Sequence, residues 1–334
     1  MSKRENEIVE LEKEFDKKKE ELESKMINGL LQYVREGKMP QSDKNYFMDC
    51  FNIIYEYTDK YIGDYILEYH NNIIKQAASE CYERLKNLTG LNFIDSFISF
   101  TDRINTLIYH MSKIFQYISS YHLRGQDDKD NTRVFQEDDV SEFSMRIYKN
   151  EFFDKLQDKV YNSLNEILIR EERNGNMEYR SKINSIMKTI TFLDYKKPKI
   201  SKDSSKKIIW VEAIKESEKK QVKLFYQDKW YCDYFKQETI KYIKNKSERD
   251  IKINSVSEYV KSALKYINEE YERENAYINI KFHEDINHIN YEYLIENNMN
   301  KIAEMDTGIK NMLQTKKKDE LSEVYKLLYF FNKY

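Results

Sequence analysis

The chain has 334 residues, of which 40% are hydrophobic, so it is long enough for two or three compact units with ordinary cores. Its 56 basic and 58 acidic residues give a net charge of −2, which excludes a global field that would attract nucleic acid or an anionic membrane. With 2 prolines and 7 glycines, it has little material for the tight turns of many short strands, and this favours helices nearly throughout.

The N-terminal segment indicates where the protein resides. Residues 1–25 are charged from the third residue onward, and no window of the chain approaches about eighteen consecutive apolar residues. We therefore expect neither a signal peptide nor a membrane span, and no membrane partner.

Cys50, Cys81 and Cys232 are odd in number and widely spaced, which predicts three packed thiols in a reducing compartment. The expected location is the cytoplasm, the nucleus or both.

Apolar residues recur at intervals of three or four in segment after segment, which predicts amphipathic helices. These segments are residues 26–38, 46–76, 97–123, 151–175, 181–193, 229–245, 255–275 and 319–331. Together they predict an all-α protein built as an elongated, solenoid-like stack of antiparallel helical bundles.

Two of these segments have well-defined features. The apolar stripe of residues 151–175 consists of Phe152, Leu156, Val160, Leu164 and Ile167 or Leu168. Gly175 follows the charged residues 170–173 and predicts a left-handed helix stop. In residues 255–275, Ser255 and Glu258 have the spacing of a capping box. The stripe of this second helix consists of Val256, Tyr259, Ala263, Ile267 and Tyr271.

Three stretches interrupt the helical pattern. Residues 123–142 are acidic and poor in apolar side chains, and residues 194–207 contain Pro198 among lysines and serines, so both are predicted to be exposed loops. Residues 315–320 are short enough to connect two helices. The positions of the breaks suggest a helical unit that recurs at roughly 110–150 residues, as in a solenoid of bundles.

The sequence contains no motif for catalysis or cofactor binding. HExxH, GxxxxGK[ST], GxGxxG and GxSxG are all absent, and His283 and His288 are too far apart to share one helix face as metal ligands. The adjacent carboxylates of Glu171 and Glu172 point in different directions on a solvated segment. We therefore expect a non-enzymatic protein without metal or cofactor, which holds other proteins.

The 28 tyrosines leave one alternative open, because aromatic rings interleaved with lysines could stack on single-stranded bases. The lysine-rich residues 196–207 would serve such a nucleic-acid binder. Many tyrosines share a helix face with Ile and Leu, however, where the ring packs and the hydroxyl reaches water. With a nearly neutral chain, we expect no nucleic-acid partner.

The string LNEILIREERNGNMEYRSKINSIMKTITFL, residues 164–193, resembles the N-terminal region of the cullin family. That region has an apolar helix ending in an ER-x-G element, then a short polar step and another apolar helix. IFQYISSYHL, residues 114–123, is similar to the aromatic end of the family's fifth helix. Segments beginning at residues 230, 254 and 294 follow in the family's order, although Asn297 and Asn298 stand where the family usually has Lys and His.

The resemblance covers roughly residues 26–334 and implies an elongated stalk of five-helix cullin repeats. It places the first repeat at residues 1–150, the second at 151–285 and the start of the third at 286–334. Family members continue into a C-terminal half that binds a RING protein and carries a lysine modified by a ubiquitin-like protein. That half is not in this chain, and the end LLYFFNKY within an apolar helix suggests an excised piece.

The resemblance also implies a docking surface, because the second and fifth helices of the first cullin repeat bind a substrate-receptor adaptor of BTB-like fold. The matching residues are Phe47, Met48, Phe51 and Ile54 in the second helix, and Ile114, Tyr117 and Tyr121 in the fifth. Their spacing places each set on one helix face. The same spacing is also typical of core residues, so a core role stays open. Ser119 and Ser120 replace the family's Asp or Asn and Arg, which leaves the adaptor's identity open.

The function implied by the resemblance is that of a non-catalytic scaffold in ubiquitin-dependent degradation. The chain would form the N-terminal portion of a cullin-RING ubiquitin ligase, dock a BTB-fold adaptor of the F-box type and act as a rigid spacer. A different helical-stack interaction protein, such as a vesicle-tethering subunit, is the alternative. Such a protein shares the architecture but would have no affinity for an F-box-type adaptor.

Overall fold

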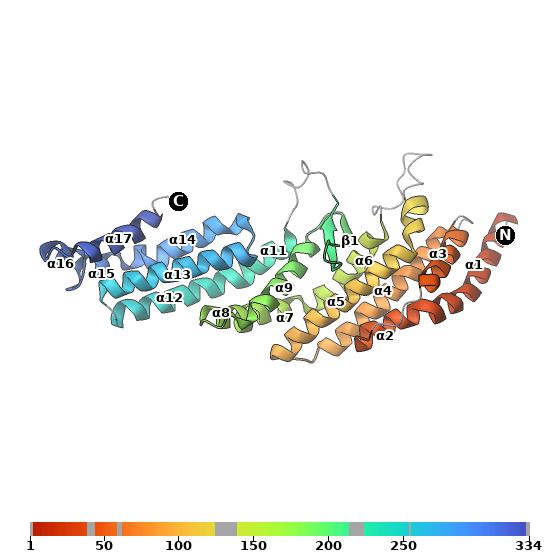
Figure 1. The fold of residues 1–334 in the computed structure, drawn as a ribbon, viewed down its shortest axis with the longest axis horizontal. Helices are drawn as coiled ribbons and strands as arrows, with labels where there is room; N and C mark the ends of the chain where they lie inside the picture. Colours follow the sequence, from red (N-terminus) through yellow and green to blue (C-terminus); the bar gives the residue numbers. More distant parts are fainter. Residues whose placement is uncertain are drawn as a thin grey trace. The chain divides into compact units, whose positions relative to one another are not determined.

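The computed structural model describes residues 3–38, 44–58, 62–123, 139–213, 224–253 and 255–331 (Figure 1). Nearly all of these residues are helical, which confirms the predicted all-α class. The chain forms two compact units. The N-terminal unit comprises Met1–Ser163 and Lys188–Lys223, and the C-terminal unit comprises Leu164–Met187 and Leu224–Tyr334. The predicted repeat boundaries are not the boundaries of these units and stay a prediction.

The N-terminal unit consists of antiparallel helices and one small sheet. In chain order its elements are α1 (Lys3–Leu22), the π-helical η1 (Glu23–Ile27), α2 (Asn28–Glu36), α3 (Lys44–Thr58), α4 (Gly63–Leu85), α5 (Gly90–Ile114), the π-helical η2 (Ile118–Leu123), α6 (Val140–Tyr148), the π-helical η4 (Lys149–Phe153), α7 (Asp154–Ser163), β1 (Pro198–Lys202) and β2 (Ile208–Glu212). The predicted helical segment 46–76 is therefore two helices, α3 and α4. Phe97 and Phe152 stack at a centroid distance of 5.7 Å in the core, where both are fully buried.

The predicted loop at residues 194–207 is wrong, because β1 and β2 form an antiparallel hairpin in which Ile200 lies opposite Trp210. The carboxylate of Asp203 accepts hydrogen bonds from the backbone N–H groups of Ser205 and Lys207 and thereby fixes the turn. Trp210 is only 7% exposed, and its indole N–H donates to Asn105 Oδ1 at 2.9 Å. The buried Trp210 on β2 therefore stabilises the hairpin, although residues 194–207 are mostly polar.

The other two predicted breaks have different outcomes. Most of the acidic stretch at 123–142, residues 124–138, lies outside the described residues. Its last three residues belong to α6, whose N-terminus is capped by the Asp139 side chain. The predicted connection at 315–320 is confirmed in its first half, because residues 315–317 separate α16 (Ile309–Gln314) from α17 (Lys318–Phe331), and residues 318–320 belong to α17.

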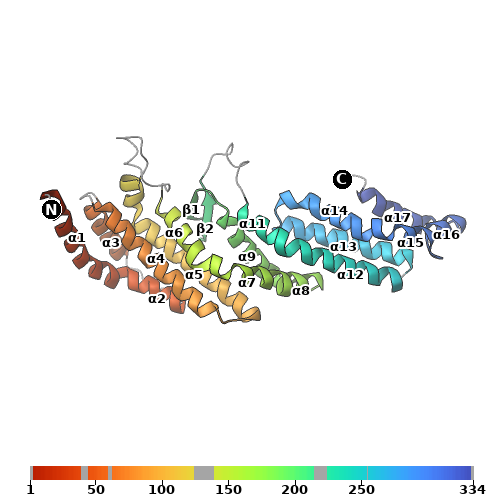
Figure 2. The ribbon, with the colours of Figure 1, turned by 180° about the vertical axis from the view of Figure 1, so that it is seen from behind.

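The C-terminal unit is also helical. Its elements are the π-helical η5 (Leu164–Ile169), α8 (Arg170–Arg173), the 3-10 helix η6 (Met177–Tyr179), α11 (Phe225–Trp230), the π-helical η7 (Tyr231–Phe235), α12 (Lys236–Ile253), α13 (Val256–Tyr277), the 3-10 helix η8 (Ile280–Phe282), α14 (His283–Leu294), the 3-10 helix η9 (Glu296–Asn298), α15 (Met299–Glu304), α16 and α17. Helix α9 (Arg180–Leu193) begins in this unit and ends in the other. Helices α12, α13 and α14 pack side by side (Figure 2).

The predicted helix ends of the C-terminal unit are confirmed. Gly175 adopts a left-handed φ of 96°, its N–H donates to Glu172 O, and the N–H of Asn176 donates to Glu171 O. This pair of hydrogen bonds is a Schellman motif, which only a residue tolerant of positive φ closes without strain. At the start of α13, Ser255 and Glu258 form the predicted capping box.

The predicted apolar stripe of α13 is wrong at its end, because Tyr271 is 55% exposed. Each step of four residues advances about 40° around a helix, so three such steps beyond Tyr259 move a side chain off the buried face. Arg273, Glu274 and Tyr277 occupy that face instead. The expectation for the cysteines is also wrong in part, since Cys50 and Cys81 are buried but Cys232 is exposed.

A buried ion cluster lies where α8 meets α13. Glu270 is fully buried; its Oε1 accepts from Arg173 Nη2 at 2.9 Å and its Oε2 accepts from Arg273 Nε at 2.9 Å. Burial alone would raise the pKa of Glu270, but the two guanidinium groups outweigh burial and hold the pKa below its ordinary value. Arg173 also donates to Thr239 Oγ1 at 2.8 Å, which connects the cluster to α12.

Glu274, one turn further along α13, gives a prediction for the pH dependence of stability. Burial raises its pKa from 4.5 to about 8, with a smaller contribution from the charge of Glu270. The native state therefore binds a proton that the unfolded state releases above about pH 4.5, and native stability falls as pH rises from there to about pH 8. We expect Glu274→Gln, which mimics the protonated acid, to stabilise the protein by about 2 kcal/mol at pH 9 and hardly at all at pH 4.

This prediction is checked by urea unfolding of the wild type and Glu274→Gln across this pH range. Glu272→Gln on the exposed side of the same helix is the control and is expected to leave the pH profile unchanged. His283, whose Nδ1 lies 3.8 Å from the carboxylate, is present in all three proteins. Parallel pH profiles for wild type and Glu274→Gln would refute the raised pKa.

Candidate functional site

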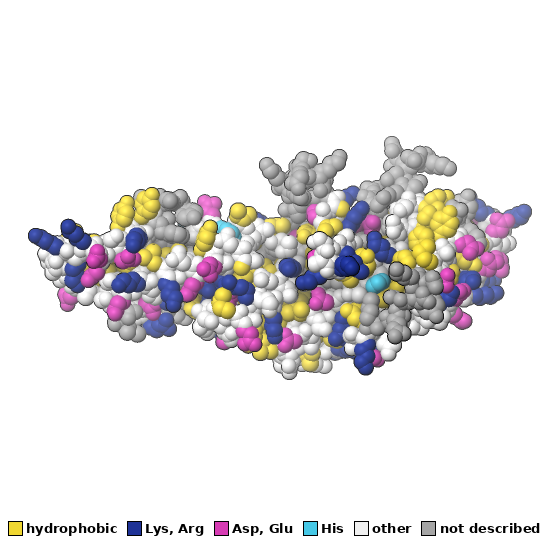
Figure 3. All heavy atoms as spheres, viewed as in Figure 1, with side chains coloured by type: hydrophobic (Ala, Val, Ile, Leu, Met, Phe, Trp, Pro, Cys, Tyr) yellow, Lys and Arg dark blue, Asp and Glu magenta, His cyan; other side chains and the backbone are white. Residues whose placement is uncertain are grey.

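An exposed row of aromatic rings joins two helical segments of the N-terminal unit. Phe51 and Tyr55 of α3 are stacked at a centroid distance of 6.5 Å, Tyr55 meets the ring of Tyr117 edge-on at 4.4 Å, and Tyr117 is stacked on Tyr121 of η2 at 5.3 Å. We call these four residues the aromatic row. Figure 3 shows hydrophobic side chains gathered over this part of α3 and the end of α5.

The structure brings together five of the seven predicted docking residues at or near this surface. Met48 is 51% exposed and Tyr121 is 50% exposed, while Phe47, Phe51 and Tyr117 are half-buried. Ile54 and Ile114 have 0% exposure. A side chain without exposed area cannot contact a partner on this face, so Ile54 and Ile114 are core residues and not docking residues. Partner binding by the other five stays a prediction.

Sequence reasoning missed Tyr55, which is 47% exposed and connects the two halves of the row. It lies four residues after Phe51, so its place beside that ring could have been found from helical spacing. Its contact with Tyr117 could not, because it depends on how α3 packs against the segment after α5.

Close packing on α4 fixes the position of η2. The imidazole of His122 lies against Gly63, where a Cβ atom would meet the ring at contact distances far below van der Waals limits. His122 Nε2 is also 2.8 Å from Asp64 Oδ1. A side chain at residue 63 would therefore clash with the His122 ring and displace it from α4. The glycine has a steric role here, not a conformational one.

Ser119 contributes to the same region from the inside. It is 4% exposed, and its Oγ accepts a hydrogen bond at 3.0 Å from the N–H of Val140, the first residue of α6. Ser119 therefore anchors the next helix, whereas Ser120 is exposed beside the row. Of the two departures from the family pattern in this segment, Ser119 and Ser120, only Ser120 has an exposed side chain.

Charged side chains border the surface near Met48. Lys25 Nζ lies 2.8 Å from Glu21 Oε1 and 3.0 Å from Asp49 Oδ2, which connects the α1–η1 segment to α3. Hydrogen bonds from Lys25 and Lys18 lower the pKa of Glu21 to about 2. An apolar centre with a charged rim is the usual composition of a protein interface.

The described residues offer little for other kinds of site. No group of His, Cys, Asp or Glu within them is arranged to hold a metal ion, and His283 lies against the backbone, with its Nε2 3.2 Å from Ile278 O. In α3 and α4, burial raises the pKa of the Cys50 thiol to about 11 and that of Cys81 to about 12, which disfavours reactive thiolates. Among the helices that the structure describes, none has the length and apolarity to cross a membrane.

Comparison with known proteins adds an independent finding. The family model of the Cullin alpha solenoid domain matches residues 8–333. Cullin-1 of Dictyostelium discoideum is 22% identical over 268 residues, which are 80% of this chain and 31% of that protein. This chain thus spans about a third of the length of that relative. Because the family model matches nearly every residue of the chain, including most of α1 that the sequence resemblance did not reach, the chain belongs to the cullin family.

Proposed function

We propose that this chain is the adaptor-docking scaffold portion of a cullin-RING ubiquitin ligase, acting in the cytoplasm, the nucleus or both. Family membership supports a scaffold role over the vesicle-tethering alternative. The observation that carries the docking role is the aromatic row, which is assembled from two segments distant in sequence and is exposed together with Met48. Aromatic and methionine side chains are enriched at the centres of protein interfaces.

The geometry of the row suits tight association. Tyr117 is in ring contact with two neighbours of the row, and Phe51 with one. Both side chains are also half-buried, so they lose little side-chain freedom when a partner binds. Met48 is flexible and polarisable and can adapt to an uneven apolar pocket. We propose a BTB-fold adaptor of the F-box type as the partner.

The proposed mechanism is non-catalytic. A helical scaffold that holds a receptor-bound substrate at a fixed distance from a ubiquitin-charged enzyme raises the effective concentration of the two reactants. The enzyme would be recruited by a RING protein through a C-terminal half that family members carry. Residues 1–334 by themselves should bind the adaptor without supporting ubiquitin transfer, and ubiquitin-chain formation by these residues with a RING protein would contradict the scaffold role.

The docking role is tested with Met48→Glu plus Tyr121→Glu, two changes at half-exposed side chains, after circular dichroism has shown that the variant is as helical as the wild type. We expect about hundredfold weaker binding of an F-box-type adaptor in calorimetric titration, because two charges would be buried in the interface. The matched control is Leu313→Glu plus Tyr325→Glu, at exposed apolar residues of the C-terminal unit, which should bind as the wild type does.

A second titration with a BTB-domain substrate receptor in place of the F-box-type adaptor identifies the adaptor class. If only this receptor binds the wild type and Met48→Glu plus Tyr121→Glu abolishes its binding, the docking surface is supported and the F-box assignment is wrong. Equal binding by this variant and the control variant would show that the aromatic row is not the docking surface. If neither protein binds the wild type, the proposed function is wrong.

A further inference from the structure

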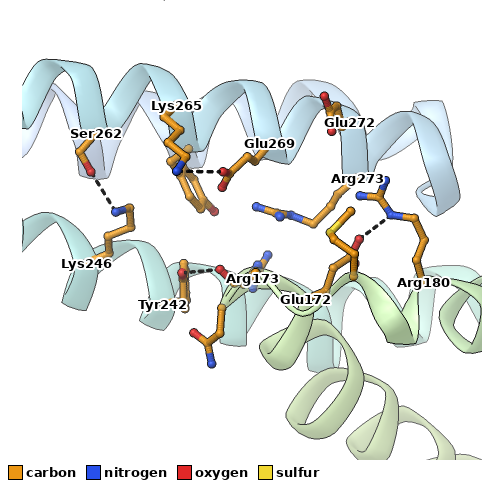
Figure 4. A pocket seen from close by; sticks show the side chains of 14 residues that line it. Glu172, Arg173, Arg180, Tyr242, Lys246, Ser262, Lys265, Glu269, Glu272 and Arg273 are labelled. Carbon is orange, nitrogen blue, oxygen red and sulfur yellow. Dashed lines mark hydrogen bonds and ion pairs between the residues drawn. The ribbon is translucent and has the colours of Figure 1, made fainter.

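A cavity of about 510 Å³ lies in the C-terminal unit, at the ER-x-G element of residues 172–175 (Figure 4). Its wall is formed by the end of α8, the turn at Asn174 and Gly175, the start of α9, and one face each of α12 and α13. The left-handed turn at Gly175 sends the chain along the cavity toward α9. Five basic side chains line the cavity: Arg173, Arg180, Lys246, Lys265 and Arg273.

The two most deeply placed cations of this cavity are incompletely neutralised. Arg173 and Arg273 share the single carboxylate of Glu270, and their side chains are each only 4% exposed. Glu172 does not compensate for them, because its Oε1 accepts from Arg180 Nε at 2.7 Å and its Oε2 accepts from the hydroxyl of Tyr277 at 2.8 Å. The buried cluster of two guanidinium groups and one carboxylate therefore retains one positive charge.

Three buried donors beside the cavity have no hydrogen-bond partner among the described residues: Arg173 Nε, Arg273 Nη2 and the hydroxyl of Tyr266. Leaving such groups without an acceptor is unfavourable, and more so for charged donors. Burial raises the pKa of Tyr266 well above its ordinary value, so its hydroxyl keeps the proton that it would donate. All three residues line the same cavity, where an acceptor-rich ligand can reach their side chains.

The other charges of the cavity lie nearer its mouth. Lys265 is 78% exposed and only loosely paired with Glu269, at 3.9 Å. Lys246 is engaged by Asp250 at 2.7 Å and by Ser262 at 3.0 Å. Glu272 is turned away from the two guanidinium groups in Figure 4. The interior of the cavity is therefore more cationic than its entrance, and Lys265 is free to turn toward an incoming anion.

We propose that this cavity binds a small phosphoryl-bearing anion, with Arg173, Arg273 and Tyr266 as donors and Lys265 closing the mouth. Phosphoryl oxygens match the planar donor geometry of guanidinium groups, and their negative charge balances the excess positive charge of the buried cluster. The volume of the cavity is large enough for more than one phosphoryl group. A bound anion would hold α8, α12 and α13 together at the point where they meet, independently of docking at the aromatic row.

The test is calorimetric titration of the whole chain with sodium pyrophosphate, with orthophosphate and ADP as parallel arms and sodium chloride at matched ionic strength as the baseline. We expect pyrophosphate to bind and to raise the melting temperature above the chloride baseline. Binding of ADP as tight as that of pyrophosphate would show that the cavity accepts the diphosphate of a nucleotide as well as free pyrophosphate. A response to chloride equal to that of the phosphates would overturn the proposal, because it would reflect ionic strength alone.

Variants separate a ligand site from a merely structural cluster. Lys265→Glu, at an exposed side chain, should leave the melting temperature unchanged and weaken pyrophosphate binding about tenfold. Lys261→Glu makes the same charge change on the exposed side of the same helix but outside the cavity, and it should leave binding unchanged. Arg273→Lys keeps the charge but removes the guanidinium fork and should weaken binding more than Lys265→Glu does. Equal effects of Lys265→Glu and Lys261→Glu would overturn the assignment to this cavity.

Discussion

Glu270→Gln is expected to lower the free energy of unfolding of the C-terminal unit by about 3–5 kcal/mol. The carboxylate of Glu270 is fully buried and accepts from both Arg173 and Arg273. The amide would remove the negative charge but leave two buried guanidinium groups close together, and their permanent charge cannot be relieved by a change of protonation. The loss therefore consists mainly of the uncompensated charge of the arginines, with the lost hydrogen bonds as a smaller part.

The two tryptophans allow the unfolding of each unit to be followed separately, since Trp210 lies in the N-terminal unit and Trp230 in the C-terminal unit. In a Trp210→Phe background, the fluorescence of Trp230 reports urea unfolding of the C-terminal unit. Glu238→Gln is the control, because Glu238 forms an exposed pair with Arg170 at 3.6 Å that is expected to contribute at most about 1 kcal/mol. A loss in Glu270→Gln no larger than that of the control would show that the cluster contributes little.

A second comparison connects the buried cluster to the proposed anion site. Glu270→Gln increases the uncompensated positive charge beside the cavity, so pyrophosphate should stabilise this variant more than it stabilises the wild type. The sign of this difference is informative, because a ligand that binds elsewhere would stabilise both proteins equally. The same logic predicts no effect of pyrophosphate on adaptor binding at the aromatic row.

The features that the sequence predicted correctly are local in origin. The capping box of Ser255 and Glu258 and the left-handed stop at Gly175 depend on a few neighbouring residues, so their spacing is sufficient evidence. The buried stripe of Phe152, Leu156, Val160, Leu164 and Leu168 follows from helical periodicity alone.

The features that could not be predicted from the sequence depend on contacts between distant segments. Ile54 and Tyr55 are adjacent in α3, yet one is fully buried and the other half-exposed, and only the packing of α3 on the segment after α5 decides which side chain a partner can reach. The end of α13 was mispredicted because the buried face there is charged. Arg273 and Glu274 have no apolar signature. Arg273 donates to the buried Glu270, which also accepts from Arg173, 97 positions away in the chain.

The hairpin at residues 198–212 is the clearest case in which local composition gave the wrong prediction. Its lysines and serines are typical of a loop, but Ile200 and Trp210 occupy directly opposite positions and are both buried. Trp210 lies 5.8 Å from the ring of Phe192 at the end of α9 and donates to Asn105 in the middle of α5. The strands are therefore stabilised by two helices rather than by their own pairing, since an isolated two-stranded hairpin is only marginally stable.

Trp210→Ala is accordingly expected to lower the free energy of unfolding of the N-terminal unit by about 3–5 kcal/mol. The truncation would remove a ring that is 7% exposed and leave the amide of Asn105, itself only 8% exposed, without its donor. Trp210→Phe retains most of the packing and should lose only about 1–2 kcal/mol through the missing hydrogen bond. Ile209→Ala, at a 37% exposed neighbour on the opposite face of the strand, should cost less than either.

The measurement is urea unfolding followed by circular dichroism, with the fluorescence of Trp230 as an internal reference for the other unit. In Trp210→Ala, the N-terminal transition should move to lower urea while the Trp230 transition stays in place, because the substituted residue belongs to the N-terminal unit. If Trp210→Ala costs no more than Ile209→Ala, the hairpin is an appendage, and its order does not depend on α5 and α9. A loss in the expected range instead makes the hairpin part of the core of the first unit, anchored to the same helix α5 whose C-terminal end leads into the aromatic row.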